Sequence, residues 1–335
     1  MSETTSHEVA PGGIHHVTMI AGDAQRNLDF YAGVLGMRLV KKTINFDDPG
    51  TYHLYYGDET GTPGTLLTFF PWPHARRGRE GAGQFNLVSL AIPPESLGWW
   101  LQRFVQQGVS HEPLATRFGE RVLAFRDPDG LQLELVGSAA AARAPGWAGG
   151  PVPAEHAIRG VHAVTLWSDA VAATAAFLEG AFGMQRVATE QGVTRWRTAS
   201  PDGDRVGTTL DVRDVSGFWD GAMGAGTVHH VAWRVPDDAS ELALRARVLG
   251  AGLGATPVID RKYFHSVYFR EPSRSLFEIA TDAPGFAVDE PLATLGESLV
   301  LPPWLEADRD RIAAALPPLH PPRTGASYSD AEVHA

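Results

Sequence analysis

Short apolar runs rich in β-branched residues recur four times along the chain. They occupy residues 13–20 (GIHHVTMI), 84–92 (QFNLVSLAI), 160–166 (GVHAVTL) and 226–233 (GTVHHVAW). Val, Thr and Ile favour strands, and a pattern that returns at intervals indicates a repeated structural unit. Each run is therefore predicted to be the first strand of one module.

Helical periodicity follows each of these strands. In the first module Asp23 is placed to cap a helix, Leu28, Tyr31 and Leu35 share one helix face, and Gly36 ends the helix. Further strand-like runs come next, for example 51–57 (TYHLYYG), 64–70 (GTLLTFF) and, in the last module, 275–280 (SLFEIA). The repeated pattern predicts a β–α–β–β–β unit.

Four such modules predict an α+β fold in which the modules form two paired-module domains. We expect modules one and two in an N-terminal domain, residues 1–140, and modules three and four in a C-terminal domain, residues 159–285. Residues 141–158 are rich in Ala, Gly and Pro, which is typical of a linker. Residues 286–335 form a Pro-rich, partly helical tail that is expected to pack over the modules.

The composition excludes several classes of function. The chain has 335 residues, no cysteine and a formal net charge of −11. Without cysteine there is no disulfide framework, Cys-ligated metal site or thiol nucleophile. An acidic chain lacks the basic surface that nucleic acids and anionic membranes select, so neither is an expected partner. The first residues do not resemble a signal peptide and no apolar run could cross a bilayer, so a cytoplasmic location is expected.

Two histidine pairs stand at matching positions of modules one and four. Side chains alternate across a strand, so His15 and His16 are expected to face opposite sides of their sheet, as are His229 and His230. Aligning the VT after the first pair with the VA after the second makes His16 and His230 equivalent. We expect both of these on the concave face.

A carboxylate in the last strand of module four completes a set of three. Glu278 lies in an apolar strand, where it is costly to bury unless it is paired or bound to a metal. Modules two and three lack the equivalent histidine and have about Val88 and Ala163 there. Only one complete set is therefore predicted, namely His16, His230 and Glu278.

The other modules carry different residues where Glu278 stands in module four. These are Thr68, Glu134 and Asp211 in modules one, two and three. With no histidine partner, Glu134 is expected to be a hydrogen-bonded or salt-bridged structural residue. Two histidines and one carboxylate with open positions are typical of non-haem Fe(II) oxygenases, and the same set also binds Zn(II) or Mn(II).

These stretches resemble the vicinal oxygen chelate superfamily, which includes glyoxalase and the extradiol dioxygenases. Within it, the chain is most similar to the hydroquinone ring-cleaving dioxygenases. The resemblance lies in GIHHVTMIAGDAQRNLDFYAGVLGMRLVKKTINFD, GTVHHVAW, IDRKYFHSVYFREP and SLFEIATD, and it extends through the tail to about residue 320. It implies metal ligands at His16, His230 and Glu278, an Fe(II) cofactor, and a small aromatic substrate and O2 as partners.

The resemblance also implies catalytic roles for four residues near the metal, which are His15, His229, Arg261 and Tyr268. His15 and His229 are candidates for proton transfer, although only a bulge would turn them from the far face of an ideal strand into the site. Antiparallel pairing of the last two strands would place Tyr268 near Glu278. Arg261 could stabilise an anionic substrate or reduced oxygen.

Substrate contacts are expected from Thr18, Arg261 and Tyr268, because Thr18 lies two residues from His16 and shares its face. Where relatives have a Gly-Gly turn before the ligand strand, this chain has Ser273 and Arg274. This departure is expected to alter the shape of the hairpin and to leave the ligands in place.

The leading prediction is an Fe(II)-dependent dioxygenase that opens hydroquinone-type rings. One alternative is a glyoxalase-like metal-dependent isomerase or lyase, which needs a fourth ligand where the poor ligand Thr68 stands. Another is a non-catalytic small-molecule binding protein of the same fold, which needs no metal. The sequence leaves a homo-oligomer open.

Overall fold

Each of the four modules contributes four strands to the structure, a computed structural model that describes residues 9–198 and 205–323. Module one contains β1 (Ile14–Ala21), α1 (Ala24–Leu28), η1 (Asp29–Val34), β2 (Arg38–Asn45), β3 (Asp48–Gly57) and β4 (Leu66–Pro71). Module two contains β5 (Gln84–Ile92), η2 (Pro94–Ser96), α2 (Leu97–Gln107), β6 (Ala115–Arg117), β7 (Glu120–Arg126) and β8 (Gln132–Gly137), followed by α3 (Ala139–Arg143).

The second half repeats this arrangement. Module three contains β9 (Gly160–Ser168), α4 (Val171–Gly180), β10 (Gln185–Glu190), β11 (Val193–Arg197) and β12 (Thr209–Asp214). Module four contains β13 (Thr227–Val235), α5 (Asp238–Gly250), β14 (Ile259–Asp260), β15 (Phe264–Arg270) and β16 (Leu276–Pro284). The tail contains η3 (Phe286–Val288), η4 (Leu292–Thr294), η5 (Pro303–Asp308) and α6 (Arg309–Ala315). Among the described residues, no helix is both long and apolar enough to span a membrane.

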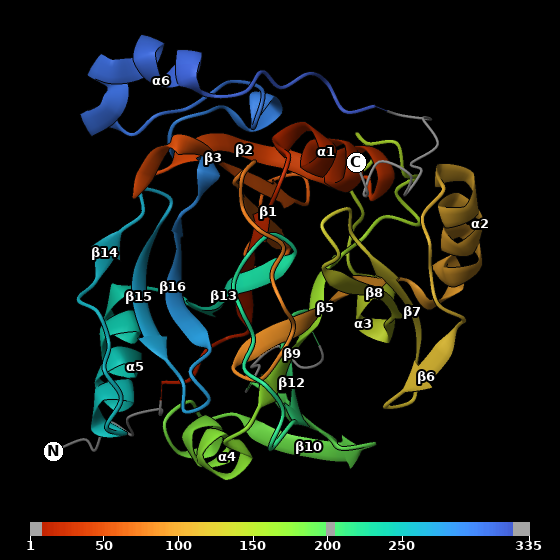
Figure 1. The fold of residues 1–335 in the computed structure, drawn as a ribbon, viewed down its shortest axis with the longest axis vertical. Helices are drawn as coiled ribbons and strands as arrows, with labels where there is room; N and C mark the ends of the chain where they lie inside the picture. Colours follow the sequence, from red (N-terminus) through yellow and green to blue (C-terminus); the bar gives the residue numbers. More distant parts are fainter. Residues whose placement is uncertain (1–8, 199–204, 324–335) are drawn as a thin grey trace, which may run out of the picture.

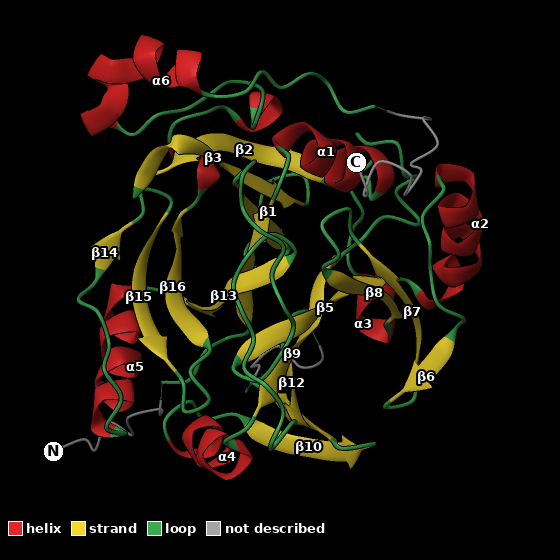
Figure 2. Ribbon diagram, viewed as in Figure 1, coloured by secondary structure: helices red, strands yellow, loops and turns green. Residues whose placement is uncertain are grey.

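The strands form two eight-stranded sheets with helices around the outside (Figures 1 and 2). The strand order is β14-β15-β16-β13-β1-β4-β3-β2 in one sheet and β10-β11-β12-β9-β5-β8-β7-β6 in the other. The predicted α+β fold of four βαβββ modules in two pairs is confirmed.

The pairing of the modules differs from the predicted one. Module one shares its sheet with module four, and module two shares its sheet with module three, so consecutive modules do not form the units expected over residues 1–140 and 159–285. Within each module the first strand pairs with the last strand along one edge, and its other edge is left unpaired. Two such edges meet at the centre of each sheet, where β1 pairs antiparallel with β13 and β5 with β9. Because all four edges are alike in sequence, the repeat alone could not select the partners. The bounds of the units along the chain stay a prediction.

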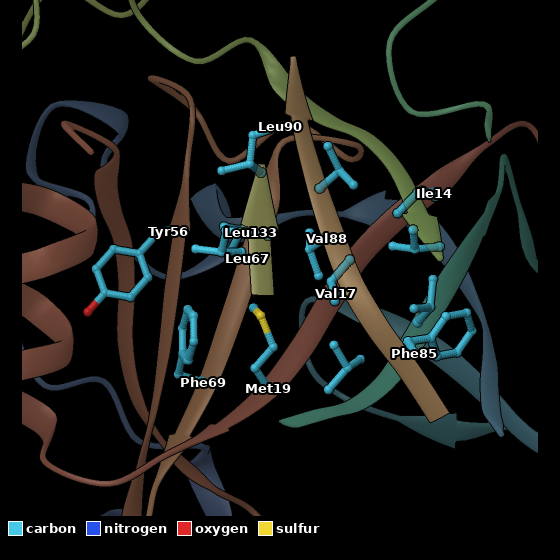
Figure 3. Close-up of a cluster of buried hydrophobic side chains, with 14 of the residues drawn as sticks. Ile14, Val17, Met19, Tyr56, Leu67, Phe69, Phe85, Val88, Leu90 and Leu133 are labelled. Carbon is cyan, nitrogen blue, oxygen red and sulfur yellow. The ribbon is translucent and has the colours of Figure 1, made fainter. Parts of the chain in front are cut away.

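A single apolar layer joins the two sheets. Val17 and Met19 of β1 face Val88 and Leu90 of β5 within one cluster of buried side chains (Figure 3). These four side chains are fully removed from solvent. Since burial of apolar area is the main favourable term in folding, this layer fixes β1, and with it the first histidine pair.

The first helix follows the prediction at its start. The side chain of Asp23 accepts a hydrogen bond of 2.7 Å from the backbone N–H of Arg26, which is an N-cap. The helix then widens into the π-helical segment η1 before Gly36, whose φ of +70° favours glycine. A Cβ at Gly36 would lie only 2.4 Å from a side-chain atom of Val152.

The tail crosses β2 and β3, as Figure 1 shows in blue. It is attached by Lys41, which is fully buried and forms ion pairs with Asp289 (2.6 Å) and Glu290. Tyr52 donates a hydrogen bond of 2.9 Å to the backbone carbonyl of Pro317, and the ring of Trp304 packs edge-on against Phe46. The predicted packing of the tail over the modules is therefore observed.

Candidate metal centre

Both histidine pairs lie on β-bulges. The pairing of β1 with β13 shifts register at each pair, so His15 and His229 have no partner residue in the facing strand. A bulge changes which face the following residues occupy, and Ile14 and Val17 thus both point into the core although they lie three residues apart. The expectation that the histidines of a pair face opposite sides is wrong, because each bulge turns both toward the concave side.

The structure brings the three predicted ligands together. The Nε2 atoms of His16 and His230 lie 3.3 Å apart, and the Oε2 atom of Glu278 lies 3.3 Å from the first and 2.8 Å from the second. An ion held at ~2.1 Å by three mutually cis ligands requires donor atoms about 3 Å apart. The three donor atoms therefore have the spacing of one face of a metal coordination shell.

Glu278 gives an independent test of whether a metal fits. Its side chain is fully buried, and Oε2, which faces the Nε2 atoms of His16 and His230, accepts no hydrogen bond from the described residues. The other oxygen, Oε1, accepts a hydrogen bond from Ser266. A buried carboxylate oxygen without a partner is costly, and a cation between the three ligands would satisfy it.

Each of the two predicted imidazole ligands contacts the histidine that precedes it. The Nδ1 atom of His15 lies 2.9 Å from Nδ1 of His16, and that of His229 lies 2.7 Å from Nδ1 of His230. A histidine that binds metal through Nε2 carries its proton on Nδ1 and donates it, so each neighbour accepts and keeps its own proton on Nε2. This arrangement fixes both ligand rings.

The charges of the site suit a cation. Burial would raise the pKa of Glu278, but His16 and His230 together hold that pKa well below its usual range. Burial lowers the pKa of His230 although Glu278 opposes the shift. An ionised carboxylate beside a neutral imidazole is the protonation state that metal binding requires.

A cavity of about 330 Å³ opens above the ligands. Its aromatic lining includes Phe70, Trp72 and Phe264, and its polar lining includes Arg261 and His229. Ligand pockets range over ~300–1,000 Å³, so this cavity suits a molecule with a single ring.

Tyr268 and Arg261 lie together on the cavity wall. Tyr268 is paired with Glu278 in the antiparallel ladder of β15 and β16, as expected. The Nε atom of Arg261 donates to the Tyr268 hydroxyl over 3.3 Å, and Nη1 pairs with Asp47 over 3.1 Å. Burial and the charge of Glu278 raise the pKa of Tyr268, so its hydroxyl stays protonated.

Thr18 and His15 do not line the cavity. The Thr18 hydroxyl is fully buried and lies 2.7 Å from the hydroxyl of Thr68, so this geometry gives no support to a substrate contact. His15 is buried behind His16, where it packs against Phe264. Its position is that of a residue that orients a ligand, whereas His229 reaches the cavity itself.

Sequence reasoning missed His53 and Tyr55, which also line the cavity. The two ring nitrogens of His53 lie 2.9 Å from the Thr68 hydroxyl and 2.8 Å from the Tyr55 hydroxyl. Burial, followed by the charge of His16, lowers the pKa of His53 well below its usual range, so the ring is neutral. The sequence does contain a signal for these two residues. In the run 51–57 (TYHLYYG), side chains alternate across the strand, so His53 and Tyr55 share one face while residues 52, 54 and 56 share the other.

Strand pairing supports the predicted equivalence of the modules. In each module, the residue predicted to be equivalent to Glu278 pairs with the same position of the first strand. The pairs are Thr18–Thr68, Ser89–Glu134, Thr165–Asp211 and Ala232–Glu278. The register corrects one position, since Leu87 rather than Val88 stands where module four has His230. Ser89 donates a 2.5 Å hydrogen bond to Glu134, which also pairs with Arg117, so the structural role predicted for Glu134 is confirmed.

Sequence comparison places the chain in a family. Residues 13–135 and 160–279 match the glyoxalase/bleomycin resistance protein/dioxygenase superfamily. The chain belongs to this superfamily, and the predicted resemblance is confirmed.

Several full-length relatives are similar over most of the chain. MhqO of Bacillus subtilis, provisionally named a ring-cleaving dioxygenase, is 47% identical over 91% of this chain and 96% of its own length. The chlorohydroquinone/hydroquinone 1,2-dioxygenase of Sphingobium indicum is 35% identical over 90% of this chain and 94% of its own length. The crystal structure of a provisionally named dioxygenase from Bacillus subtilis superposes with a TM-score of 0.87 at 45% identity, covering 94% of this chain and 99% of that one. Glyoxalase I from Zea mays, at 16% identity and a TM-score of 0.62 over 85% of this chain and 97% of its own, shares the fold.

Proposed function

We propose that the protein is a metal-dependent dioxygenase that opens hydroquinone-type rings, that is substituted 1,4-dihydroxybenzenes, with O2. The observation that carries the proposal is the set of three donor atoms of His16, His230 and Glu278, two of whose residues, His16 and His230, line an aromatic cavity. The names of the relatives from Bacillus subtilis and Sphingobium indicum support the same chemistry. Both oxygen atoms enter the ring-opened product, so no external reductant is required.

Fe(II) is the proposed resident ion, held by His16, His230 and Glu278. When bound, it supplies the Lewis acid that lowers the pKa of a substrate hydroxyl and the electrons for O2 chemistry. The donor set of two imidazoles and one carboxylate, with Glu278 ionised, fits this ion.

The cavity residues orient the ring and manage charge around it. Phe70, Trp72 and Phe264 present aromatic surface to a planar substrate. Arg261 places a permanent positive charge where an anionic oxygen develops, and the protonated Tyr268 hydroxyl beside it donates a hydrogen bond. His229 accepts its Nδ1 bond from His230, so its Nε2–H is a donor rather than a base.

No observation favours the glyoxalase-like alternative. That reading requires a fourth ligand at the position of Thr68. The Thr68 hydroxyl instead makes hydrogen bonds with Thr18 and His53.

Anaerobic loading with Fe(II), followed by measurement of O2 uptake, tests the proposal. Hydroquinones should drive stoichiometric uptake of O2, whereas the hemithioacetal of methylglyoxal and glutathione should drive none. Glu278→Gln keeps the shape of the side chain but removes its charge, and it should lose both Fe(II) retention and uptake. Fe(II)-loaded protein that consumes no O2 with any dihydroxybenzene would exclude the proposal.

A further inference from the structure

A second group of potential metal ligands lies on the outer side of the sheet, away from the cavity. Asp238 and Glu241 stand three residues apart in the first turn of α5 and therefore share a helix face. His265, near the start of β15, faces them. The ligand atoms of the three residues all lie within 4.8 Å of one another, and Nδ1 of His265 is 2.7 Å from a carboxylate oxygen of Asp238.

Glu241 provides a separate indication that something is bound there. The residue is 0% exposed, yet neither of its carboxylate oxygens has a hydrogen-bond partner among the described residues. A buried carboxylate without a partner must take up either a proton or a cation. Burial raises the pKa of Glu241 to about 7, and Asp238 and Glu278 oppose ionisation further, while His265 favours it.

Asp238 and His265 reach solvent, whereas Glu241 is buried. The side chains of Asp238 and His265 are 68% and 37% exposed, so an ion could reach them directly, whereas Glu241 closes the inner side. This combination of an accessible mouth and a buried anionic floor differs from the usual surface cluster of acids, in which every carboxylate is solvated.

We infer that Asp238, Glu241 and His265 form a second divalent-metal site that takes a zinc-like transition-metal ion, with water completing its coordination. An imidazole with two carboxylates suits Zn(II), while Mg(II) and Ca(II) prefer oxygen ligands alone. This assignment does not depend on the proposed dioxygenase activity.

The ion would connect the start of α5 to β15. His265 is followed by Ser266, whose side chain points to the opposite face and donates a hydrogen bond to Glu278. The outer site therefore supports the strand that holds a ligand-orienting group of the inner centre. Its role is structural, because none of its three residues lines the cavity.

Equilibrium dialysis of the full chain against Zn(II) tests the inference by counting bound ions. Wild-type protein should bind two ions per chain, Glu241→Gln one and Glu278→Gln one, while the double variant should bind none. Glu179→Gln, the same change at an exposed position of α4, should leave two. Glu241→Gln should fold, because a neutral amide removes a buried charge. Melting temperatures give a second readout: Zn(II) should raise the melting temperature of Glu278→Gln, but not that of the double variant Glu241→Gln/Glu278→Gln.

His265→Gln provides a second test of the ligand set. It should also bind one ion fewer than the wild type. The inference is overturned if Glu278→Gln binds no ion, or if Glu241→Gln or His265→Gln binds as many ions as the wild type. A wild type that binds one ion, kept in Glu278→Gln and lost in Glu241→Gln, would support the outer site and count against the inner one.

Discussion

His229 and His230 are joined by a hydrogen bond between their Nδ1 atoms, 2.7 Å apart, across a β-bulge. The bond makes the orientation of the His230 ring, a proposed metal ligand, depend on the ring of His229. His15 and His16 repeat the arrangement at the equivalent bulge, over 2.9 Å. In both pairs the proposed ligand thus has its own orienting partner, supplied by the residue before it in sequence.

Replacing His229 should weaken the proposed metal centre. His229→Phe keeps an aromatic ring but removes the acceptor for the His230 proton, and loss of such a partner typically lowers metal affinity ~10–100-fold. Competition with an Fe(II) chelator measures the change. Trp72→Phe, which alters the cavity without touching a ligand, is the matched control and should retain wild-type affinity. Equal affinity in the two variants would show that the bond between the histidines has no orienting role.

Replacing Arg261 should impair turnover while leaving metal content intact. Arg261→Lys keeps the charge but loses the planar donor group that reaches the Tyr268 hydroxyl and Asp47. We expect kcat/KM for a hydroquinone to fall ~10–100-fold, corresponding to loss of one or two charged hydrogen bonds. Asp47→Asn should cost less than about threefold, because the Asp47 side chain is 74% exposed and its ion pair is screened. If Asp47→Asn lowered kcat/KM as much as Arg261→Lys, the ion pair that positions the Arg261 loop, rather than the guanidinium in the cavity, would account for the effect.

Asp127 should make stability depend on pH. Burial and then the charge of Asp129 raise the pKa of Asp127 from 3.8 to about 7, although the backbone N–H of Leu131 and the Tyr31 hydroxyl donate to its carboxylate. Between pH 4 and 7 the folded state therefore holds a proton that the unfolded state has released, so rising pH should lower the free energy of unfolding over this range.

Asp127→Asn should remove most of this pH dependence. The amide oxygen can still accept from the backbone, while no proton is exchanged. Relative to the variant, the wild type should lose stability on the order of 1–3 kcal/mol between pH 4 and pH 7. Urea unfolding of both proteins at the two pH values measures the difference, and parallel curves would contradict the assignment.

The repeat and the convergence of the three proposed ligands could be predicted because both depend on local alternation. Glu278 stands in an apolar strand, and His16 and His230 precede equivalent positions, so counting modules leaves one complete set. The orientation of His15 could not be predicted, because a bulge depends on the register with a strand more than 200 residues away. Which modules share a sheet could not be predicted either, because the first strands of all four modules have similar unpaired edges. The alternation around His53 marks a polar face of its strand, but only the sheet shows that this face lines the cavity.

Lys41 should determine whether the tail stays attached. Its ammonium group is fully buried between Asp289 and Glu290, and it also donates to the backbone carbonyl of Phe286 over 3.2 Å. Lys41→Met would leave Glu290 buried without its counter-ion, and removal of one partner from such a pair costs about 3 kcal/mol or more. Lys42→Met is the control, because Lys42 is half-buried and its ammonium group donates to one backbone carbonyl among the described residues, that of Glu297 over 3.0 Å, so its loss should cost under ~1 kcal/mol.

Urea unfolding midpoints and limited proteolysis distinguish the two lysine variants. Lys41→Met should unfold at lower urea and be cleaved faster in the tail than Lys42→Met, because it leaves Glu290 buried without its counter-ion. If both variants resist urea and protease equally, the aromatic contact of Trp304 with Phe46 and the hydrogen bond of Tyr52 suffice to hold the tail. In that case the buried ion pair specifies where the tail docks and adds little to the strength of its attachment.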